Sequence, residues 1–479
     1  MTASLIDEQP SASTSSRGRW IEHWEPEDEQ FWASTGRRTA RRNLIFSIFS
    51  EHLAFSVWVL WSILVVQMGT LKVAGAAAFP DLVATPANAN KIFWIVALPN
   101  LIGAFMRIPY TLAVGRFGGR NWTVVSAVLL LIPITLAVYC VTHPGTPYPV
   151  LLLCAATAGF GGGNFASSMA NISYFYPEKQ KGFALGLNAA GGNVGIASMQ
   201  LAAPILVGFF LLPVAVAAEV WFPLVAVSAI CAFLFMNNLH VSRATLREQF
   251  AAVRKPHAWI MSFLYIGTFG SFLGLSAAFP AVLKFIFPDN TTVTIGFLTF
   301  HDKALALPLA FLGALVGSLA RPIGGWLADR IGGALVTASV FTLMAIGSIG
   351  AIQTAASKNF ELFLVSMLLL FAMSGAGNGS AYRMIPAIFK RELDRDLAAG
   401  PADATQLTVR ARQLGAATLG MAGAFGAMGG FILPKVIGDS IKATHGISTA
   451  FSWFIAMYLV CLVVTAVVYL RPGTMFSRV

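Results

Sequence analysis

The chain has 479 residues, of which 56% are hydrophobic and only 11% are charged, against roughly 25% charged in an ordinary soluble domain. This composition excludes a soluble enzyme, and it excludes a soluble nucleic-acid-binding protein although the formal net charge is +11. In a membrane protein, such positive charge is expected to gather in the segments on the cytoplasmic side.

Apolar runs long enough to cross a bilayer recur from Leu44 to Leu470, since about 20 apolar residues span the hydrocarbon layer. In chain order, we predict an N-terminal tail without a cleaved signal peptide (1–43), a six-span bundle (44–239), a polar linker (240–257), a second six-span bundle (258–470) and a short C-terminal tail (471–479). The expected fold class is all-α integral membrane. The twelve predicted transmembrane helices cover about 44–68, 92–115, 122–141, 149–175, 183–211, 219–238, 258–287, 304–328, 335–355, 361–389, 413–437 and 447–470.

An even number of spans puts both termini on one side of the membrane, which allows a test by loop charge. With the termini inside, the inner segments hold 22 Lys and Arg residues, the outer segments hold 7, and 3 lie within spans. Because positively charged loops remain in the cytoplasm, we predict that both termini and the linker are cytoplasmic.

The two halves share an ungapped repeat, whose offset is the separation of Arg107 and Arg321. Two six-helix halves with a common pattern are typical of transporters whose substrate binds between the repeats near the bilayer midplane. In the first half, the repeated residues are Gly103, Arg107, Arg116, Gly118, Gly119, Thr123, Gly161, Gly163, Asn164 and Phe175.

Arg107 and Arg321 each lie eight residues before the end of a predicted span, or about 12 Å into the membrane. A charge at such a depth costs about 2.5–3.5 kcal/mol, so an intramembrane arginine indicates a functional site or a structural ion pair. Glu51 is the only acidic residue well inside a span and can pair with one arginine at most. We therefore favour an anion site, because two planar guanidinium groups suit a small planar oxyanion.

Other residues in the spans carry weaker signals. Glycines cluster in the fourth, fifth, tenth and eleventh spans, which favours close helix packing and is also compatible with sliding or bending surfaces. Asn164 and Asn193 lie among these glycines, and they are either links between helices or donors to a substrate. Tyr265 and Phe269 share one helix face, which by itself is more typical of core packing than of a binding wall.

The sequence predicts no catalytic residue, metal ligand or cofactor. The seven histidines contain no i,i+4 pair, the four cysteines contain no CxxC spacing, and no GxxxxGK[ST] phosphate loop is present. The usual ligand patterns of zinc and of ATP are therefore missing. Nothing in the sequence requires an oligomer, so a monomer is expected.

Two loop segments, Gly115–Arg120 and Gly325–Gly333, resemble the cytoplasmic loop motif of the major facilitator superfamily, although the first copy lacks the usual acidic residue. The run Gly159–Ser173, followed by Ala184–Gly195, resembles the nitrate signature of the nitrate/nitrite porter family, and Ser374–Ser380 resembles its second signature. This resemblance implies the major facilitator fold, with two pseudo-symmetric bundles in a bacterial inner membrane. It also implies transport of nitrate and nitrite rather than an enzyme activity.

The resemblance further implies roles for residues that match the family motifs. Arg107 and Arg321 would clamp the anion, Asn193 and Tyr265 would hydrogen-bond it, Phe165 and Phe269 would stack on its faces, and Asn164 in the signature is a further binding candidate. Arg383, in the tenth span, is either an anion step nearer the cytoplasm or the partner of another group.

Glu51 and His52 bear on how transport is coupled. Exchange of nitrate for nitrite needs no protonatable group, whereas proton symport needs one that titrates in the pathway. Glu51 or His52 would supply it, unless Glu51 neutralises Arg383 or another arginine. We favour nitrate/nitrite exchange, with nitrate/proton symport, a carrier of another small anion and a non-transporting anion sensor as alternatives.

Overall fold

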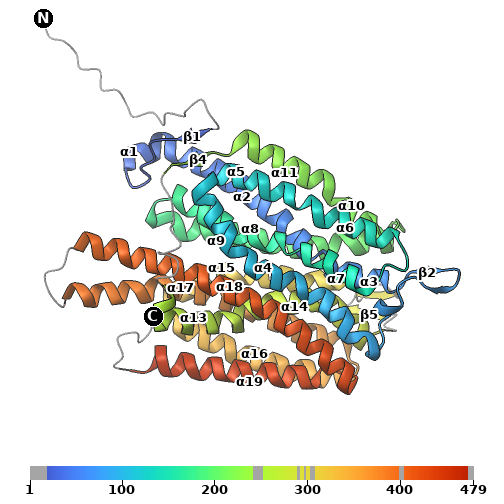
Figure 1. Cartoon of the computed structure of the whole chain (residues 1–479). Helices are drawn as coiled ribbons and strands as arrows, with labels where there is room; N and C mark the ends of the chain where they lie inside the picture. The colour runs from blue at the N-terminus through green and yellow to red at the C-terminus, as the bar shows by residue number, and fades with distance from the viewer. Residues whose placement is uncertain are drawn as a thin grey trace, which may run out of the picture.

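The computed structural model describes residues 19–240, 252–288, 292–295, 298–301, 308–398 and 404–472. Two helical bundles lie side by side, the N-terminal one in blue to green and the C-terminal one in yellow to red (Figure 1). Within the described residues, twelve helices are long and apolar enough to cross a membrane. The predicted all-α fold with twelve spans is confirmed.

The N-terminal bundle contains the first six spans, several of which are broken into two helical pieces. Its helices are α1 (Glu29–Phe31), the π-helical η1 (Trp32–Gly36), α2 (Arg37–Trp58), α3 (Leu60–Met68), α4 (Ala89–Phe117), α5 (Gly119–Leu129), α6 (Leu131–Thr142), α7 (Tyr148–Thr157), α8 (Phe160–Phe175), α9 (Glu178–Pro204), the π-helical η4 (Ile205–Phe209), α10 (Val216–Glu219) and α11 (Trp221–Phe235). Short 3₁₀ turns, η2 (Pro80–Leu82) and η3 (Pro86–Asn88), precede α4.

The C-terminal bundle contains the other six spans. Its helices are the 3₁₀ turn η5 (Ala252–Arg254), α13 (Pro256–Tyr265), the π-helical η6 (Ile266–Gly270), α14 (Ser271–Ile286), the 3₁₀ turn η7 (Pro308–Ala310), α15 (Phe311–Ile331), α16 (Gly333–Ala356), α17 (Phe360–Ala398), α18 (Ala404–Thr444), α19 (Ser448–Thr465) and the π-helical η8 (Ala466–Leu470). Three two-stranded sheets complete the described structure: parallel β1 (Trp20–Ile21) with β4 (Asn238–Leu239), and antiparallel β2 (Lys72–Val73) with β3 (Ala76–Ala77) and β5 (Thr292–Ile295) with β6 (Leu298–His301).

The segment before the first span is more ordered than a polar tail. Helix begins at Glu29 rather than near residue 44, and β1 ties the segment to β4 at the end of the first bundle. The indole of Trp24 donates to the backbone carbonyl of Tyr174 at 3.1 Å. Residues 1–18 and the linker residues 241–251 lie outside the described chain, as do residues 302–307 at the predicted start of the eighth span.

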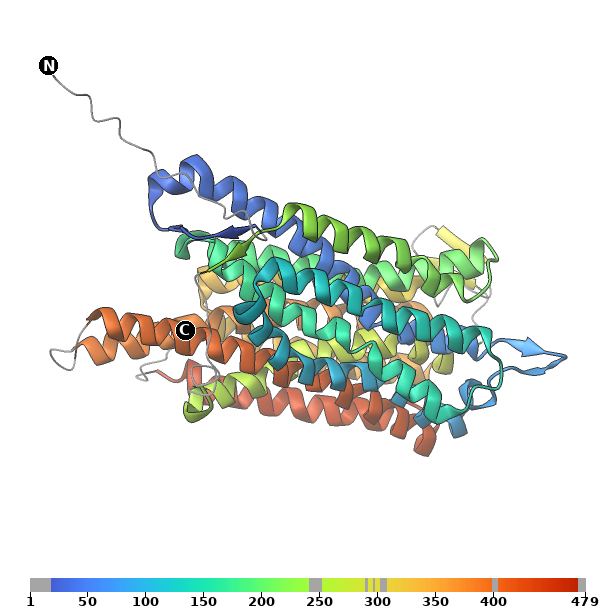
Figure 2. The same cartoon turned by 45° about the horizontal axis from the view of Figure 1, so that its top comes forward.

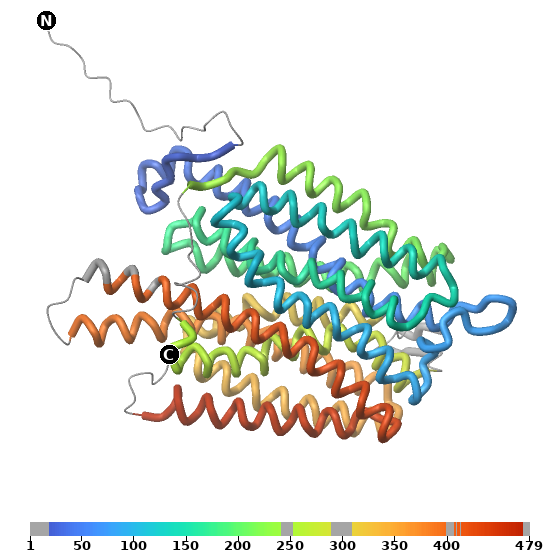
Figure 3. Tube along the Cα trace, viewed as in Figure 1, coloured from blue at the N-terminus to red at the C-terminus, as the bar shows by residue number. Residues whose placement is uncertain are grey.

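Both ends of the described chain lie on one face of the bundles, seen from two angles in Figures 1 and 2. We call this the terminal face and the opposite one, which carries β2 and β3, the distal face. The trace in Figure 3 shows α17 and α18 running beyond the other helices at the terminal face. Because α17 reaches Ala398, the tenth span continues as a helix well past its predicted end.

Repeated glycines make equivalent turns in the two bundles. Gly118 ends α4 with φ of +86°, and Gly332 ends α15 with φ of +95°. Only glycine adopts this backbone region without strain. The two positions are related by the repeat offset, so the pseudo-symmetry predicted from sequence extends to backbone conformation.

Glycine also permits close contact between the second and fourth spans of each bundle. A Cβ atom on Gly162 would lie 2.7 Å from Cα of Gly103, and one on Gly375 would lie 2.0 Å from the carbonyl oxygen of Gly317. Small residues allow helix backbones to approach in this way. These contacts support the packing interpretation of the glycine clusters.

The variant Gly375→Ala is expected to destabilise the protein by about 1–3 kcal/mol, since overpacking forces the two helices apart. The matched control is Gly420→Ala, because a Cβ there would meet no atom within 4 Å. Thermal unfolding of both purified variants in the same detergent checks this. Equal melting temperatures would contradict the close contact.

Candidate anion site between the bundles

The site is built around Arg107, which α4 carries in the membrane-spanning region. The side chain is 3% exposed, and Nη1 donates to the backbone carbonyl of Gly423 on α18 at 2.8 Å. The hydrogen bond crosses from one bundle to the other. It fixes a buried positive charge at the boundary between them.

Arg321 takes the matching position on α15 and is also 3% exposed. Its Cζ lies 5.7 Å from the ring centroid of Phe165, and Cζ of Arg107 lies 4.6 Å from the same centroid. The two charges are therefore no farther apart than the sum of these distances. No ion pair within the described chain includes either arginine, so their repulsion is not offset by a direct carboxylate contact.

Aromatic rings surround the two guanidinium groups. Phe165 on α8 and Phe269 in η6 stack with centroids 5.9 Å apart, and Tyr265 stacks on Phe269 at 5.2 Å. Cζ of Arg107 is 5.1 Å from the Phe269 ring. The structure thus brings together five of the residues singled out in the sequence, drawn from four transmembrane spans.

The arginines retain donors that no described residue uses. Nε and Nη2 of Arg107 and Nη1 of Arg321 are buried without a hydrogen-bond partner in the described part of the chain. The Tyr265 hydroxyl is buried near both charges and interacts with the Arg321 guanidinium. Buried donors of this kind need an explanation, and a small planar anion bound edge-on to them, with aromatic rings against its faces, provides one.

The two predicted asparagines lie in different places. Asn193 on α9 is 1% exposed, and its Oδ1 has no hydrogen-bond partner among the residues that the structure describes. Asn164 on α8 lines a small cavity within the N-terminal bundle instead. That oxygen is an acceptor, so Asn193 stays a predicted donor to the anion only through its Nδ2 amide, whereas Asn164 belongs to a separate polar cluster.

A family model described as Major Facilitator Superfamily matches residues 44–398. The nitrate/nitrite transporter NarU of Salmonella typhimurium is 36% identical over 470 residues, which cover 94% of this chain and 96% of the relative. The chain belongs to the nitrate/nitrite porter family of the major facilitator superfamily. The family predicted from the loop motifs and nitrate signatures is confirmed.

Other relatives agree with this membership. The probable nitrate/nitrite antiporter NarK2 of Thermus thermophilus is 33% identical, over 96% of this chain and 98% of the relative. Among solved structures, a D-xylose–proton symporter matches 89% of this chain and 97% of its own with a TM-score of 0.61 and 15% identity, which supports the fold. This porter is a multi-pass membrane transporter and not an enzyme.

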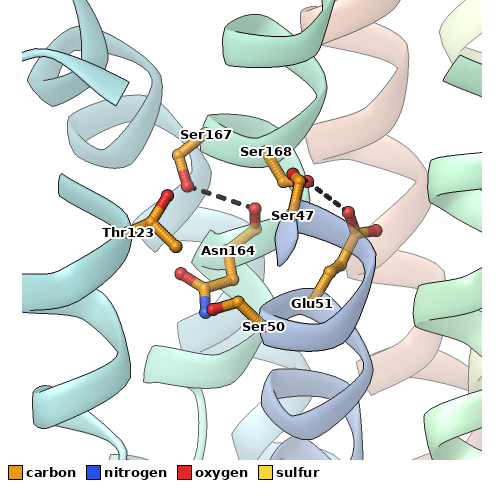
Figure 4. Close-up of a pocket in the computed structure, with 7 residues that line it drawn as sticks. All are labelled: Ser47, Ser50, Glu51, Thr123, Asn164, Ser167 and Ser168. Atoms are coloured by element: carbon orange, nitrogen blue, oxygen red, sulfur yellow. Dashed lines mark hydrogen bonds between the residues drawn. The ribbon is translucent and has the colours of Figure 1, made fainter. Parts of the chain in front are cut away.

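Glu51 lies on α2, in the N-terminal bundle of this porter. Its carboxylate accepts hydrogen bonds from Ser168 on α8 and from Asn188 on α9, the latter at 2.6 Å. A cavity of about 10 Å³ adjoins it (Figure 4), enough for roughly one water molecule. The cavity is lined by Ser47, Ser50, Glu51, Thr123, Asn164, Ser167 and Ser168.

His52 and Arg383 are placed away from the anion site. Nδ1 of His52 lies 3.1 Å from the carbonyl oxygen of Gly191, so the ring links α2 to α9. Arg383 forms an ion pair with Asp329 of α15 and is largely exposed. The sequence left Arg383 open to pairing with Glu51, but its ion-pair partner in the structure is Asp329.

We expect Asp329 and Arg383 to act as a unit in this porter. Asp329→Asn and Arg383→Gln should each reduce transport, and the double variant should be no worse than the more damaging single variant, since residues in one ion pair give non-additive effects. Initial rates of nitrate uptake by the four forms check this. Additive losses would indicate that the two residues act separately.

Sequence reasoning missed three groups at the arginines. Cζ of Arg107 lies 5.8 Å from the Trp58 ring, Cζ of Arg321 lies 5.6 Å from the Tyr382 ring, and Gly423 offers its carbonyl. Tyr382 was detectable, since it lies two residues after the second signature and directly precedes Arg383. Trp58 and the Gly423 carbonyl have no such motif.

Hydrogen bonds join the bundles between the arginines and the distal face. Asn90 donates to Asp439 at 2.9 Å, and Asn100 donates to the carbonyl of Gly430 at 3.0 Å, both from α4 to α18. Gln200 on α9 donates to the carbonyl of Ser276 on α14 at 2.6 Å. The structure is therefore held together on its distal side.

Proposed function

We propose that the protein carries nitrate and nitrite across the bacterial cytoplasmic membrane, with the anion held between Arg107 and Arg321. The observation that carries the proposal is the pair of buried guanidinium groups, both against Phe165 and both with unused donors. Relatives named as nitrate/nitrite transporters, at up to 36% identity over nearly the whole chain, support the choice of anion. Loop charge supports a cytoplasmic terminal face.

Transport proceeds by alternating access. The bundles rock about the arginine pair, which an anion reaches first from one face and then from the other. Without an anion the like charges repel and oppose closure; a bound anion neutralises one charge and permits it. Exchange of nitrate for nitrite is the coupling that the arginine pair supports by itself, because one monoanion replaces another.

Counterflow tests the proposed function. Vesicles containing the purified protein are loaded with unlabelled nitrate and placed in labelled nitrate, with no pH gradient, and nitrite, formate and acetate are then tried as the internal anion. We expect nitrate and nitrite to support rapid exchange and the carboxylates to support little. Equal exchange with formate would indicate a general small-anion carrier, and binding without exchange would indicate an anion sensor.

Nitrate/proton symport is a second candidate, favoured by the buried carboxyl group of Glu51 near the arginines. No ion pair of the described chain engages this group. An intramembrane carboxyl group is costly and marks a proton pathway in many transporters.

A further inference from the structure

We propose that Glu51 is the internal counter-ion of the arginine pair, and that it binds one proton whenever nitrate takes its place as counter-ion. This rests on the proposed function and deepens it, because it adds a residue that allows the empty carrier to return. The result is net transport of one nitrate with one proton, in addition to exchange. The position of Glu51, its unsatisfied oxygen and the cavity beside it carry the inference.

The position of Glu51 in the internal repeat supports this role. The repeat offset that relates Arg107 to Arg321 also relates Glu51 to Tyr265 and Phe55 to Phe269. Tyr265 and Phe269 belong to the cluster of aromatic rings beside the arginines. The ring centroid of Phe55 lies 6.0 Å from that of Phe165, which is in the same cluster. Pseudo-symmetry therefore aims Glu51 at the site from the other bundle.

The depth of Glu51 agrees with this. It precedes Phe55 by one turn of α2, and its partner Ser168 follows Phe165 by three residues of α8. At 1.5 Å per residue, the backbone of Glu51 lies about 5–6 Å along the helix axis from that of Phe55, toward the terminal face. A carboxylate at this depth is close enough to act on the arginine charges without contacting them directly.

The surroundings of Glu51 are otherwise uncharged. The charged and titratable groups that act on it are Arg321 on α15, Arg107 on α4 and Tyr382 on α17. Helices α5, α8 and α9 contribute neutral groups there, among them Thr123, Ser168 and Asn188, and His52 bonds to Gly191 on another face of α2. Arg107 and Arg321 thus act on the carboxylate through long-range electrostatic attraction, without an ion-pair contact.

The cavity provides a route for the proton. Oε1 of Glu51, Oγ of Ser50 and Oδ1 of Asn164 are all buried without a hydrogen-bond partner in the described chain, and all three residues line it (Figure 4). A single water would satisfy such atoms. The hydroxyls of Ser47 and Ser168, 2.8 Å apart, continue from Glu51 toward the terminal face. A proton reaching the water passes to the carboxylate, forms one O–H bond, and leaves by the reverse step.

The net charge of the site couples nitrate binding to protonation of Glu51. The empty site with Glu51 ionised carries two arginine charges less one, a net of +1. With nitrate bound and Glu51 protonated, the net is again +1, so the two forms that must reorient are electrostatically alike. Nitrate and the proton each favour binding of the other, and such linkage is reciprocal. The empty site with Glu51 protonated carries +2 and stays open.

Two assays on the same vesicles test the proposal. The first is nitrate counterflow at equal pH; the second is net nitrate accumulation with no internal anion, driven by an acidic exterior, with internal pH followed by a dye. We expect the counterflow rate of Glu51→Gln to stay within about threefold of that of the unmodified protein. Its proton-driven nitrate accumulation and its nitrate-dependent proton entry should both fall at least tenfold. The rate of uptake by the unmodified protein should not depend on an imposed membrane potential, because one proton accompanies one nitrate and no net charge moves.

Controls separate this residue from others. His52→Gln tests the adjacent titratable group, and Glu219→Gln removes an exposed carboxylate of α10; both should keep proton-driven accumulation. The proposal is overturned if Glu51→Gln keeps it, or if the unmodified protein shows counterflow without it. Absence of counterflow in the unmodified protein would overturn the proposed function instead.

A measurement on the unmodified protein remains decisive if Glu51→Gln fails to fold. Titration calorimetry of nitrate binding, in buffers of different ionisation enthalpy, reports the protons taken up. We expect proton uptake on binding, and tighter binding at lower pH, by up to about tenfold per pH unit. Binding that is independent of pH and of buffer would reject Glu51 as the coupled group.

Discussion

Lysine at position 107 or 321 is expected to raise the nitrate concentration for half-maximal uptake by roughly 30-fold or more. This corresponds to a loss of about 2 kcal/mol in the free energy of nitrate binding. Lysine keeps the charge but lacks the planar fork that binds an oxyanion through two parallel hydrogen bonds. At Arg107 it also lacks the second nitrogen that would keep the bond to the Gly423 carbonyl while donating to an anion. Initial rates of labelled nitrate uptake in vesicles measure the effect.

The matched control is Arg116→Lys, in the same helix α4 but exposed. It should leave uptake unchanged, since an exposed charge contributes little to a buried site. If Arg107→Lys and Arg321→Lys both kept full uptake, the two arginines would act as point charges and the clamp would be rejected. Loss at only one position would indicate that the site is asymmetric.

Removing the ring of Phe165 should weaken nitrate binding by a similar amount. Both arginine Cζ atoms lie within 6 Å of this ring, so Phe165→Ala removes two cation–π contacts, each worth about 1–2 kcal/mol when shielded from water. It also leaves a void between the bundles. Nitrate affinity measured by calorimetry, and uptake at saturating nitrate, check this.

Phe165→Leu separates the ring from its volume. Leucine fills most of the space but offers no aromatic face, so we expect a fold like that of the unmodified protein with nitrate affinity still reduced. Phe105→Ala, on the exposed surface of α4, is the control for loss of a phenylalanine. An affinity in Phe165→Leu equal to that of the unmodified protein would show that the ring only fills space.

The fold was predictable where hydrophobicity decides it. A run of apolar residues must cross the bilayer as a helix because backbone groups need internal partners there. The same signal stops at the membrane surface, which is why the early start at Glu29 and the late end at Ala398 were missed. Both extensions carry many charges, and a helix in water leaves no trace in hydropathy.

The candidate site was predictable where it contains charged residues, whose burial in the membrane costs free energy. Arg107 and Arg321 are conspicuous because charge is rare in the spans, and the repeat offset relates them. Trp58 is one of 11 tryptophans, and only helix rotation decides which of them reaches an arginine. The carbonyl of Gly423 belongs to the backbone, which has the same chemistry at every residue, so only packing of α4 on α18 could reveal it.

The hydrogen bonds of Asn90 and Asn100 with α18 have a consequence for reagents that recognise this protein. They hold helices from the two halves together at the distal face, so the surface there is a composite epitope of both. An antibody fragment that spans α4 and α18 would bind only while these helices touch. With the purified protein, such a reagent would report the fraction of carriers closed on that side.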